Sequence, residues 1–308
     1  MTATRKPLDP RVTEQRNPRT AAIDLASSLE IVDLINAEDR TVPDVVASQR
    51  EAIARAVDLV EQTFRRGGRL FYIGAGTSGR LGILDAAECP PTYGSDPEMV
   101  QGLIAGGLPA LTRAQEGAED RPENAAKDVA ERDLGPKDFL IGIAASGTTP
   151  YVRAGIEEAK RRGAAVGILA CSPPPEDVLR MVDIAILPIT GPEVVTGSTR
   201  MKAGTATKLV LNTITTGAMI RLGKTYGNLM VDLKATNNKL KDRSERILVE
   251  VCGVTRDEAR ALLERSDRSV KTAIVMQKLG LDRDAALRAL ESAGGVIRRV
   301  IREEPPPV

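Results

Sequence analysis

The sequence predicts an α/β protein in which helices cover both faces of a doubly wound parallel five-stranded sheet, followed by a small all-helical module. Three observations support this fold class. Short apolar runs of strand length alternate with helical patterns through the middle of the chain, as in sheets built from strand–helix–strand units. The last part has helical spacing and many charges. The length of 308 residues is enough for both parts.

The N-terminal elements come first in this scheme. Residues 1–20 are polar with scattered prolines and are predicted to form a flexible arm. Apolar residues at intervals of three to four predict one helix from near Ser27 and a second over 42–66, which Gly67 and Gly68 would end. The buried strands are then expected at 70–73, 100–105, 139–144, 165–170 and 184–189.

Beyond the last strand, we expect a helix over 199–222 and an irregular stretch over 224–232. Thr255 with Glu258 three residues later forms a capping-box pattern, and Asp282 is a second helix cap. The C-terminal tail contains three consecutive prolines. These signals divide the chain into a flexible arm (1–20), a sheet domain (21–236), a helical bundle (237–303) and a disordered tail (304–308).

Composition excludes several classes of function. The net charge is +1 and aromatic residues make up 2% of the chain, so neither charge nor base stacking favours a nucleic-acid partner. No apolar run reaches membrane-spanning length. The cysteines number three and lie far apart, which fits neither a disulfide framework nor a metal site. We therefore expect a cytoplasmic protein with no membrane or nucleic-acid partner.

Histidine is absent from the chain. Its absence removes the commonest general base, the commonest zinc ligand and the nucleophile–histidine pairs of many hydrolases. Acid–base chemistry must therefore depend on Glu, Asp, Lys, Tyr or Cys.

Two of the predicted strands end in turns of glycine and hydroxyl residues, 74–79 (GAGTSG) and 145–150 (ASGTTP). Glycine turns expose backbone N–H groups, and the helix that follows adds its positive N-terminus, so such turns suit an anion. A dinucleotide would need an acidic residue at the end of the next strand, and that strand ends at Ile104-Ala105-Gly106. The pair of loops instead favours one compact phosphate.

Carboxyl groups follow both of the first two strands. Glu88 precedes Pro90 and Pro91, which are expected to end the helix and leave Glu88 in its last turn, where the dipole disfavours negative charge and suits a general acid. Residues 116–120 (EGAED) form a second acidic cluster. For each, a solvated helix end is the alternative interpretation. In a chain without histidine, these groups are the best candidates for an acid–base pair.

The segments GAGTSGRLGILDAAECPPTYG, GLIAGG, EGAED, AASGTTPYV, EVVTGSTRMKAGTATKLVLN and GNLMVD closely resemble those of the N-acetylmuramic acid 6-phosphate etherases. This bacterial family has the sugar-isomerase (SIS) fold and is related to the glucokinase regulatory protein. The similarity runs in order from about Glu14 into the C-terminal bundle.

The resemblance implies a carbon–oxygen lyase of peptidoglycan recycling. Such an enzyme removes D-lactate from N-acetylmuramic acid 6-phosphate by elimination, then adds water to give N-acetylglucosamine 6-phosphate. The family's general acid falls on Glu88 and its second catalytic glutamate on Glu119. The implied chemistry needs no metal and no other cofactor. The resemblance also implies a homodimer with residues of both subunits at the site, and a C-terminal module similar to ubiquitin-associated domains.

The resemblance further assigns residues to the sugar phosphate. Thr148 departs from the family, which commonly has arginine at this position, so a charged phosphate contact is missing. Arg200 and Lys202 stay open, because a helix start or a dimer contact explains them equally well. The substrate-binding residues expected are Gly76, Thr77, Ser78, Ser146, Gly147, Thr148, Thr149, Glu193 and Ser198.

Three other functions are compatible with a sugar-phosphate fold. A sensor protein without catalysis would need the phosphate loops but not Glu88 and Glu119. An isomerase is disfavoured because the similarity extends well beyond the phosphate loops. A transcription regulator would need a DNA-binding helix-turn-helix, for which the sequence gives no signal.

Overall fold

The computed structural model describes residues 9, 11–233 and 238–303. They form two compact units. One consists of the residues up to Ala87 together with Glu98–Thr215, and the other of Glu88–Pro97 together with the residues from Thr216 onward. The boundary between the sheet part and the C-terminal part therefore falls inside helix α8 (Lys202–Arg221). The sequence predicts it at residue 236, where the chain becomes all-helical and highly charged. The predicted tail at 304–308 lies outside the described residues.

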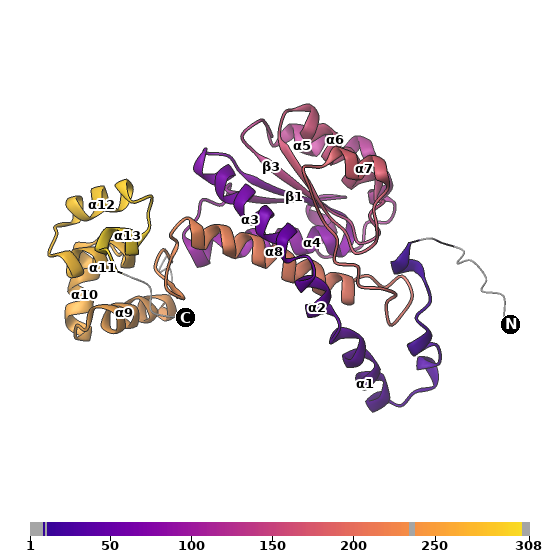
Figure 1. Ribbon diagram of the computed structural model, residues 1–308, viewed down its shortest axis with the longest axis horizontal. Helices are drawn as coiled ribbons and strands as arrows, with labels where there is room; N and C mark the ends of the chain where they lie inside the picture. Colours follow the sequence, from indigo (N-terminus) through magenta and orange to yellow (C-terminus); the bar gives the residue numbers. More distant parts are fainter. Residues whose placement is uncertain (1–8, 10, 234–237, 304–308) are drawn as a thin grey trace. The chain divides into compact units, whose positions relative to one another are not determined.

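The first unit contains the predicted five-stranded parallel sheet, with the strand order β2-β1-β3-β4-β5. Figure 1 labels β1 and β3 of this sheet. The chain leaves β1 toward β2 at one edge and returns to β3 on the other side of β1. A ligand site is expected at this change of direction, outside the carboxyl ends of the strands. The strands are β1 (Leu70–Gly74), β2 (Val100–Ile104), β3 (Phe139–Ile143), β4 (Ala165–Leu169) and β5 (Ile184–Ile186).

Helices cover both faces of this sheet (Figure 1). A Cβ atom on Gly82 of α4 would lie 2.8 Å from the Tyr72 side chain, and one on Gly155 of α6 would lie 2.3 Å from Ile73. Successive strand residues point to opposite faces, so α4 and α6 pack on opposite sides, and glycine allows the close approach. The helices wholly within this unit are α1 (Ser28–Asp39), α2 (Val42–Ala47), α3 (Arg50–Arg65), α5 (Pro122–Glu131), α6 (Pro150–Arg161) and α7 (Glu176–Met181). Helix α4 (Gly76–Tyr93) belongs to it up to Ala87, and α8 up to Thr215.

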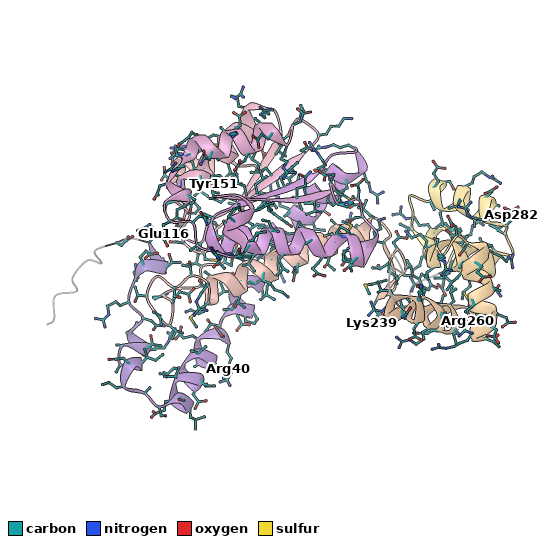
Figure 2. All side chains as sticks on the ribbon, turned by 180° about the vertical axis from the view of Figure 1, so that it is seen from behind. Arg40, Glu116, Tyr151, Lys239, Arg260 and Asp282 are labelled. Carbon is teal, nitrogen blue, oxygen red and sulfur yellow. The ribbon has the colours of Figure 1, made fainter. Side chains whose placement is uncertain are left out.

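Buried hydrogen bonds between neighbouring elements fix this arrangement. Tyr151 of α6, labelled in Figure 2, donates its hydroxyl to Asp128 of α5 at 2.5 Å. Asp85 of α4 accepts hydrogen bonds from Tyr72 of β1 at 2.9 Å and from Asn212 of α8 at 2.6 Å. Burial raises the pKa of Asp85 against these bonds. The Asp85 contacts hold α4 between the sheet and α8.

The prediction of a flexible N-terminal arm is wrong for residues 11–20. This segment forms the short 3-10 helices η1 (Val12–Glu14) and η2 (Pro18–Thr20). Thr13 is fully buried and its carbonyl accepts a hydrogen bond from the amide of Gly197 at 3.3 Å. The Thr20 hydroxyl donates to the Val194 carbonyl at 2.8 Å. The polar composition of this segment suggested a flexible arm. Its polar groups instead form hydrogen bonds to the distant residues Val194 and Gly197.

A buried ion pair joins α1 to the start of α8. Lys202 Nζ lies 2.7 Å from Glu38 Oε2, and the two side chains are 1% and 2% exposed. Arg19 also pairs with Glu38. The sequence allows Lys202 to be either a helix start or a dimer contact. In the structure it is the first residue of α8, and its ammonium group is buried inside the first unit.

Replacing Glu38 by glutamine is expected to destabilise the fold in a pH-dependent way. The Arg19 bond and then the Lys202 bond hold the pKa of Glu38 at about 2 against burial, compared with 4.5 for the free group. The ion pairs therefore stabilise the fold above pH 4.5, and this stabilisation is lost as the pH falls toward 2. At neutral pH the variant should be less stable by about 3 kcal/mol.

Urea unfolding of both proteins at several pH values measures this effect. The difference in unfolding free energy should shrink as the pH is lowered from about 5 to 3. A difference that stays constant over this range would contradict the role given to Glu38.

Helix α4 runs through Pro90 and Pro91 to Tyr93, so the prediction that the prolines end it is wrong. Buried side chains hold its last turn in place: Cys89 is 3% and Tyr93 8% exposed. The Tyr93 hydroxyl also donates to Thr216 at 3.2 Å. Glu88 is exposed and lies more than one turn before the helix end, so the helix-dipole argument does not apply to it.

The second unit is mainly a helical bundle with its own apolar core, which includes Leu248, Ala273 and Ile274. The predicted capping box of Thr255 and Glu258 is present, and Asp282 (labelled in Figure 2) caps α12 through the Ala285 amide at 2.8 Å. The irregular stretch at 224–232 contains a small antiparallel pair of strands. The elements are β6 (Thr225–Tyr226), β7 (Leu229–Met230), α9 (Asn238–Cys252), α10 (Arg256–Arg265), α11 (Val270–Leu279), α12 (Arg283–Ser292) and α13 (Ile297–Ile301).

A search of the described residues finds no helix with the length and apolar character needed to cross a membrane.

Candidate functional site

The two predicted phosphate loops lie next to each other at the carboxyl edge of the sheet. The first follows β1 and opens α4 at Gly76, and the second follows β3 and opens α6 at Pro150. Because β1 and β3 are hydrogen-bonded neighbours in register from Leu70–Phe139 to Gly74–Ile143, their following loops meet above the same part of the sheet. Two helix N-termini therefore point to one place, which favours an anion there.

A cavity of about 480 Å³ lies at this place, large enough for a small ligand. Both loops and the short helix η5 (Ala118–Asp120) contribute to its wall, together with two segments distant in the sequence, 11–14 and 197–199. The lining residues are Arg11, Glu14, Ala75, Gly76, Thr77, Ser78, Glu119, Asp120, Ile143, Ala145, Ser146, Thr148, Thr149, Pro150, Gly197 and Thr199.

The second loop is shaped by its own hydrogen bonds. The hydroxyls of Ser146 and Thr148 lie 3.1 Å apart, and the Thr148 amide donates to Ser146 Oγ at 3.3 Å. Gly147 has a φ of 75° and does not line the cavity. A Cβ at this position would lie 2.9 Å from Pro174 Cα. Gly147 therefore shapes the turn, and its neighbours Ser146 and Thr148 line the cavity.

Glu119 lies on the cavity wall beside the first loop. It belongs to η5, which follows Gly117 in a left-handed conformation with φ of 69°. A second cavity of about 190 Å³ shares Ala75, Gly76 and Glu119 with the first and extends toward Glu116, which Figure 2 labels. A carboxylate at this shared edge can exchange a proton with a ligand whose phosphate occupies the loops.

Glu88 does not line either cavity. It is exposed and belongs to α4. At 1.5 Å per residue, it lies about 16 Å along the helix from Thr77. The sequence predicts that Glu88 and Glu119 both belong to the site. Within a single chain, only Glu119 lies on the cavity wall with the phosphate loops.

Glu193 also has a position different from the expected one. It is fully buried and lies outside the cavity. Its carboxylate accepts hydrogen bonds from the amides of Lys202 at 3.0 Å and Ala203 at 2.9 Å, at the start of α8. Burial raises its pKa, and the two amide bonds act in the opposite direction. Glu193 thus fixes the loop that leads to α8, and it does not contact the cavity.

Ser198 is half-buried and does not itself line the cavity, although its neighbours Gly197 and Thr199 do. The expected place of Ser198 near a ligand stays a prediction. Arg200 is exposed and likewise lies outside the cavity wall.

Sequence reasoning missed Arg11 and Glu14, which both line the cavity. The available signal was that family similarity already begins near Glu14, inside the segment predicted to be flexible. Among the described residues of the cavity wall, Arg11 is the only cation, whereas Glu14, Glu119 and Asp120 are acidic. No cluster of metal-ligating side chains is found in the part of the chain that the structure describes.

Curated relatives match the chain over nearly its whole length. An N-acetylmuramic acid 6-phosphate etherase from Rhodopirellula baltica is 53% identical over 294 residues, covering 96% of this chain and 97% of the relative. One from Brucella anthropi is 52% identical, covering 96% and 95% of the two chains. The chain belongs to the N-acetylmuramic acid 6-phosphate etherase family. The resemblance inferred from the sequence motifs is confirmed.

A broader family model describes part of the same chain. The glucokinase regulatory protein N-terminal SIS domain matches residues 52–160, which include both phosphate loops and Glu119. Among solved structures, a phosphoheptose isomerase from Neisseria gonorrhoeae is 19% identical and covers 62% of this chain and 98% of its own, with a TM-score of 0.47. A putative sugar-phosphate isomerase from Listeria monocytogenes is 16% identical and covers 65% and 94%, with a TM-score of 0.48.

The second loop carries no charged side chain among the residues that line the cavity. Thr148 lines the cavity between Ser146 and Thr149. A threonine hydroxyl can donate one hydrogen bond, whereas arginine would add a charged, bidentate contact. The loop alone therefore offers a phosphate only neutral donors and the N-terminus of α6.

Proposed function

We propose that this chain cleaves the D-lactyl ether of N-acetylmuramic acid 6-phosphate, giving D-lactate and N-acetylglucosamine 6-phosphate in the recycling of cell-wall amino sugars. The observation that carries the proposal is about 50% identity to the etherases over nearly the full length of both chains. The cavity that joins the phosphate loops to Glu119 supports it, since a sugar phosphate and an acid–base group would meet there.

Phosphate binding is the first requirement of this reaction. In the proposed complex, the amides and hydroxyls of Gly76, Thr77 and Ser78 and of Ser146, Thr148 and Thr149 hold the 6-phosphate. All six residues line one cavity. The open-chain sugar then extends from its anchored phosphate toward Glu119. The smaller cavity that shares Glu119 provides room for a substituent of the sugar.

The elimination step requires a base and an acid. The proton at C2 is acidic only when C1 is an aldehyde, so the ring must be open. Glu119, in the proposed role of base, takes the C2 proton, and the electrons of that C–H bond form the C2–C3 double bond. The C3–O bond breaks, and the departing lactate oxygen receives a proton from Glu88. A positioned acid or base contributes about 10²–10⁴-fold to rate.

Water addition completes the reaction. A water molecule attacks C3 of the unsaturated aldehyde, and C2 regains a proton. The sum is substrate plus water to lactate plus N-acetylglucosamine 6-phosphate, with no change of oxidation state overall. The C2 proton of the product then comes from the acid–base group or from solvent.

A homodimer with a shared site accommodates the position of Glu88. Since Glu88 does not line the cavity of its own chain, a second copy can supply it. We also propose that the protein works in the cytoplasm, where its substrate class is metabolised. Cys89, Cys171 and Cys252 are thiols and not disulfide partners in the structure, and thiols persist in a reducing compartment.

A sugar-phosphate sensor is the second candidate, and the match of residues 52–160 to the glucokinase regulatory domain favours it. A sensor requires the phosphate loops but no acid–base group. The presence of Glu119 on the wall of the same cavity favours the etherase.

Incubation with N-acetylmuramic acid 6-phosphate in D₂O tests the proposal. We expect stoichiometric release of D-lactate and one deuterium at C2 of the product, detected by an enzymatic lactate assay and by NMR. Binding of the substrate without lactate release would instead support the sensor.

A further inference from the structure

The cavity has an unbalanced set of charges for a phosphate ligand. Its wall carries three carboxylates, Glu14, Glu119 and Asp120, and Arg11 is the only cation among the described lining residues. A phosphate monoester carries up to two negative charges near pH 7. Helix N-termini and hydroxyls favour this charge, but nearby carboxylates oppose it. A cation on the wall would therefore contribute strongly to phosphate affinity.

Arg11 is held at the cavity by its backbone. The next residue, Val12, donates its amide to Ser172 Oγ at 3.1 Å. Ser172 is fully buried and lies just beyond β4. Thr13 is fully buried and bonds to Gly197 of the cavity wall. These contacts fix η1 itself, so Arg11, the residue just before it, reaches the cavity from an ordered segment.

The guanidinium group of Arg11 is oriented by Asp9. Nε of Arg11 donates to Asp9 Oδ1 at 2.9 Å, and the Arg11 amide donates to the same oxygen at 2.9 Å. Arg11 in turn lowers the pKa of Asp9 to about 2. Among the described residues, Nη1 of Arg11 has no hydrogen-bond partner. Arginine has five N–H donors in a planar fork, so Arg11 keeps donors for a second anion while it stays paired with Asp9.

Thr148 lines the same cavity as Arg11, and its side chain carries no charge. We propose that Arg11 supplies the charged phosphate contact of this site, from a segment distant in sequence from the second loop. This inference rests on the proposed function for the identity of the ligand, a sugar 6-phosphate. It assigns Arg11 as a phosphate-binding residue, with Asp9 as its ion-pair partner.

Binding measurements with the product test this assignment without requiring turnover. We expect Arg11→Gln to weaken the affinity for N-acetylglucosamine 6-phosphate, measured by calorimetry, by about 10- to 100-fold. Binding of unphosphorylated N-acetylglucosamine should stay the same. Adding Thr148→Arg to Arg11→Gln should restore at least about tenfold, because it returns a cation to the same cavity. The matched control is Arg16→Gln, since Arg16 is exposed and outside the cavity wall. This variant should bind N-acetylglucosamine 6-phosphate with the affinity of the wild type.

A structural role of Arg11 predicts a different result. If Arg11 served only as the partner of Asp9, Asp9→Asn would reduce affinity as much as Arg11→Gln, and Thr148→Arg would restore nothing. Our assignment predicts that Asp9→Asn changes affinity less than about threefold, since Arg11 keeps its charge. Unchanged product affinity in Arg11→Gln would overturn the inference even if the wild type releases lactate. Weakened product affinity would support it even if lactate release is not found.

Discussion

Replacing Glu119 by glutamine is expected to lower the rate of lactate release by about 10²–10⁴-fold, with the affinity for N-acetylglucosamine 6-phosphate nearly unchanged. Glutamine has the shape of glutamate but cannot accept the C2 proton. Glu119 is exposed within η5, so the change should not affect folding. Steady-state lactate release and calorimetry of product binding measure the two effects separately.

Deuterium incorporation at C2 is a second measurement on the Glu119→Gln variant. If Glu119 is the base, solvent deuterium should fail to enter C2, and no unsaturated aldehyde should accumulate. An initial burst of lactate together with accumulated aldehyde would instead place Glu119 in the water-addition step and contradict its role as base. Glu123→Gln is the control, because Glu123 is exposed in the first turn of α5 and outside the cavity.

Mixing two inactive variants should restore activity if the site is shared between subunits. We expect Glu88→Gln alone to lose lactate release by about 10²–10⁴-fold, as Glu119→Gln does. In a mixed dimer whose sites each combine Glu119 of one chain with Glu88 of the other, one site keeps both carboxyl groups. Random exchange makes about half of the dimers mixed, so the unfractionated mixture should regain about a quarter of wild-type activity and the purified mixed dimer about half.

The two variants carry different affinity tags and are co-expressed so that mixed dimers form. Two successive affinity columns, one for each tag, isolate the mixed dimer. Recovery depends on the site combining two chains, because a site built from one chain would always lack one carboxyl group. Purified mixed dimers that stay inactive would contradict the shared site. Full activity of the Glu88→Gln protein by itself would remove Glu88 from the mechanism.

The sequence predicted the five-stranded sheet and the two glycine-rich turns at its edge correctly, because their signals are local. Each strand is a short apolar run, and each loop is marked by glycine and hydroxyl residues next to it. The register between β1 and β3 then brings Gly76 and Ser146 together with no further information. The capping box at Thr255 was predictable for the same reason, since its partners are three residues apart.

The errors concern residues whose surroundings come from distant parts of the chain. The prolines of α4 do not end the helix, because the buried side chains of Cys89 and Tyr93 hold its last turn in place. Glu193 lies in a segment that resembles the etherases, yet its carboxylate accepts hydrogen bonds from amides at the start of α8. No local pattern distinguishes a buried capping carboxylate from one that contacts a ligand.

By itself the sequence determined the fold class, the family and the kind of ligand, because periodicity, turn chemistry and motif similarity are properties of short segments read in order. Only the tertiary structure decided which side chains share a cavity. It brought Arg11 and Glu14 to the phosphate loops and left Glu88 outside. The physical reason is that a cavity is closed by segments that meet through packing and long-range hydrogen bonds, such as Thr13 to Gly197, and these contacts leave no periodic trace in the chain.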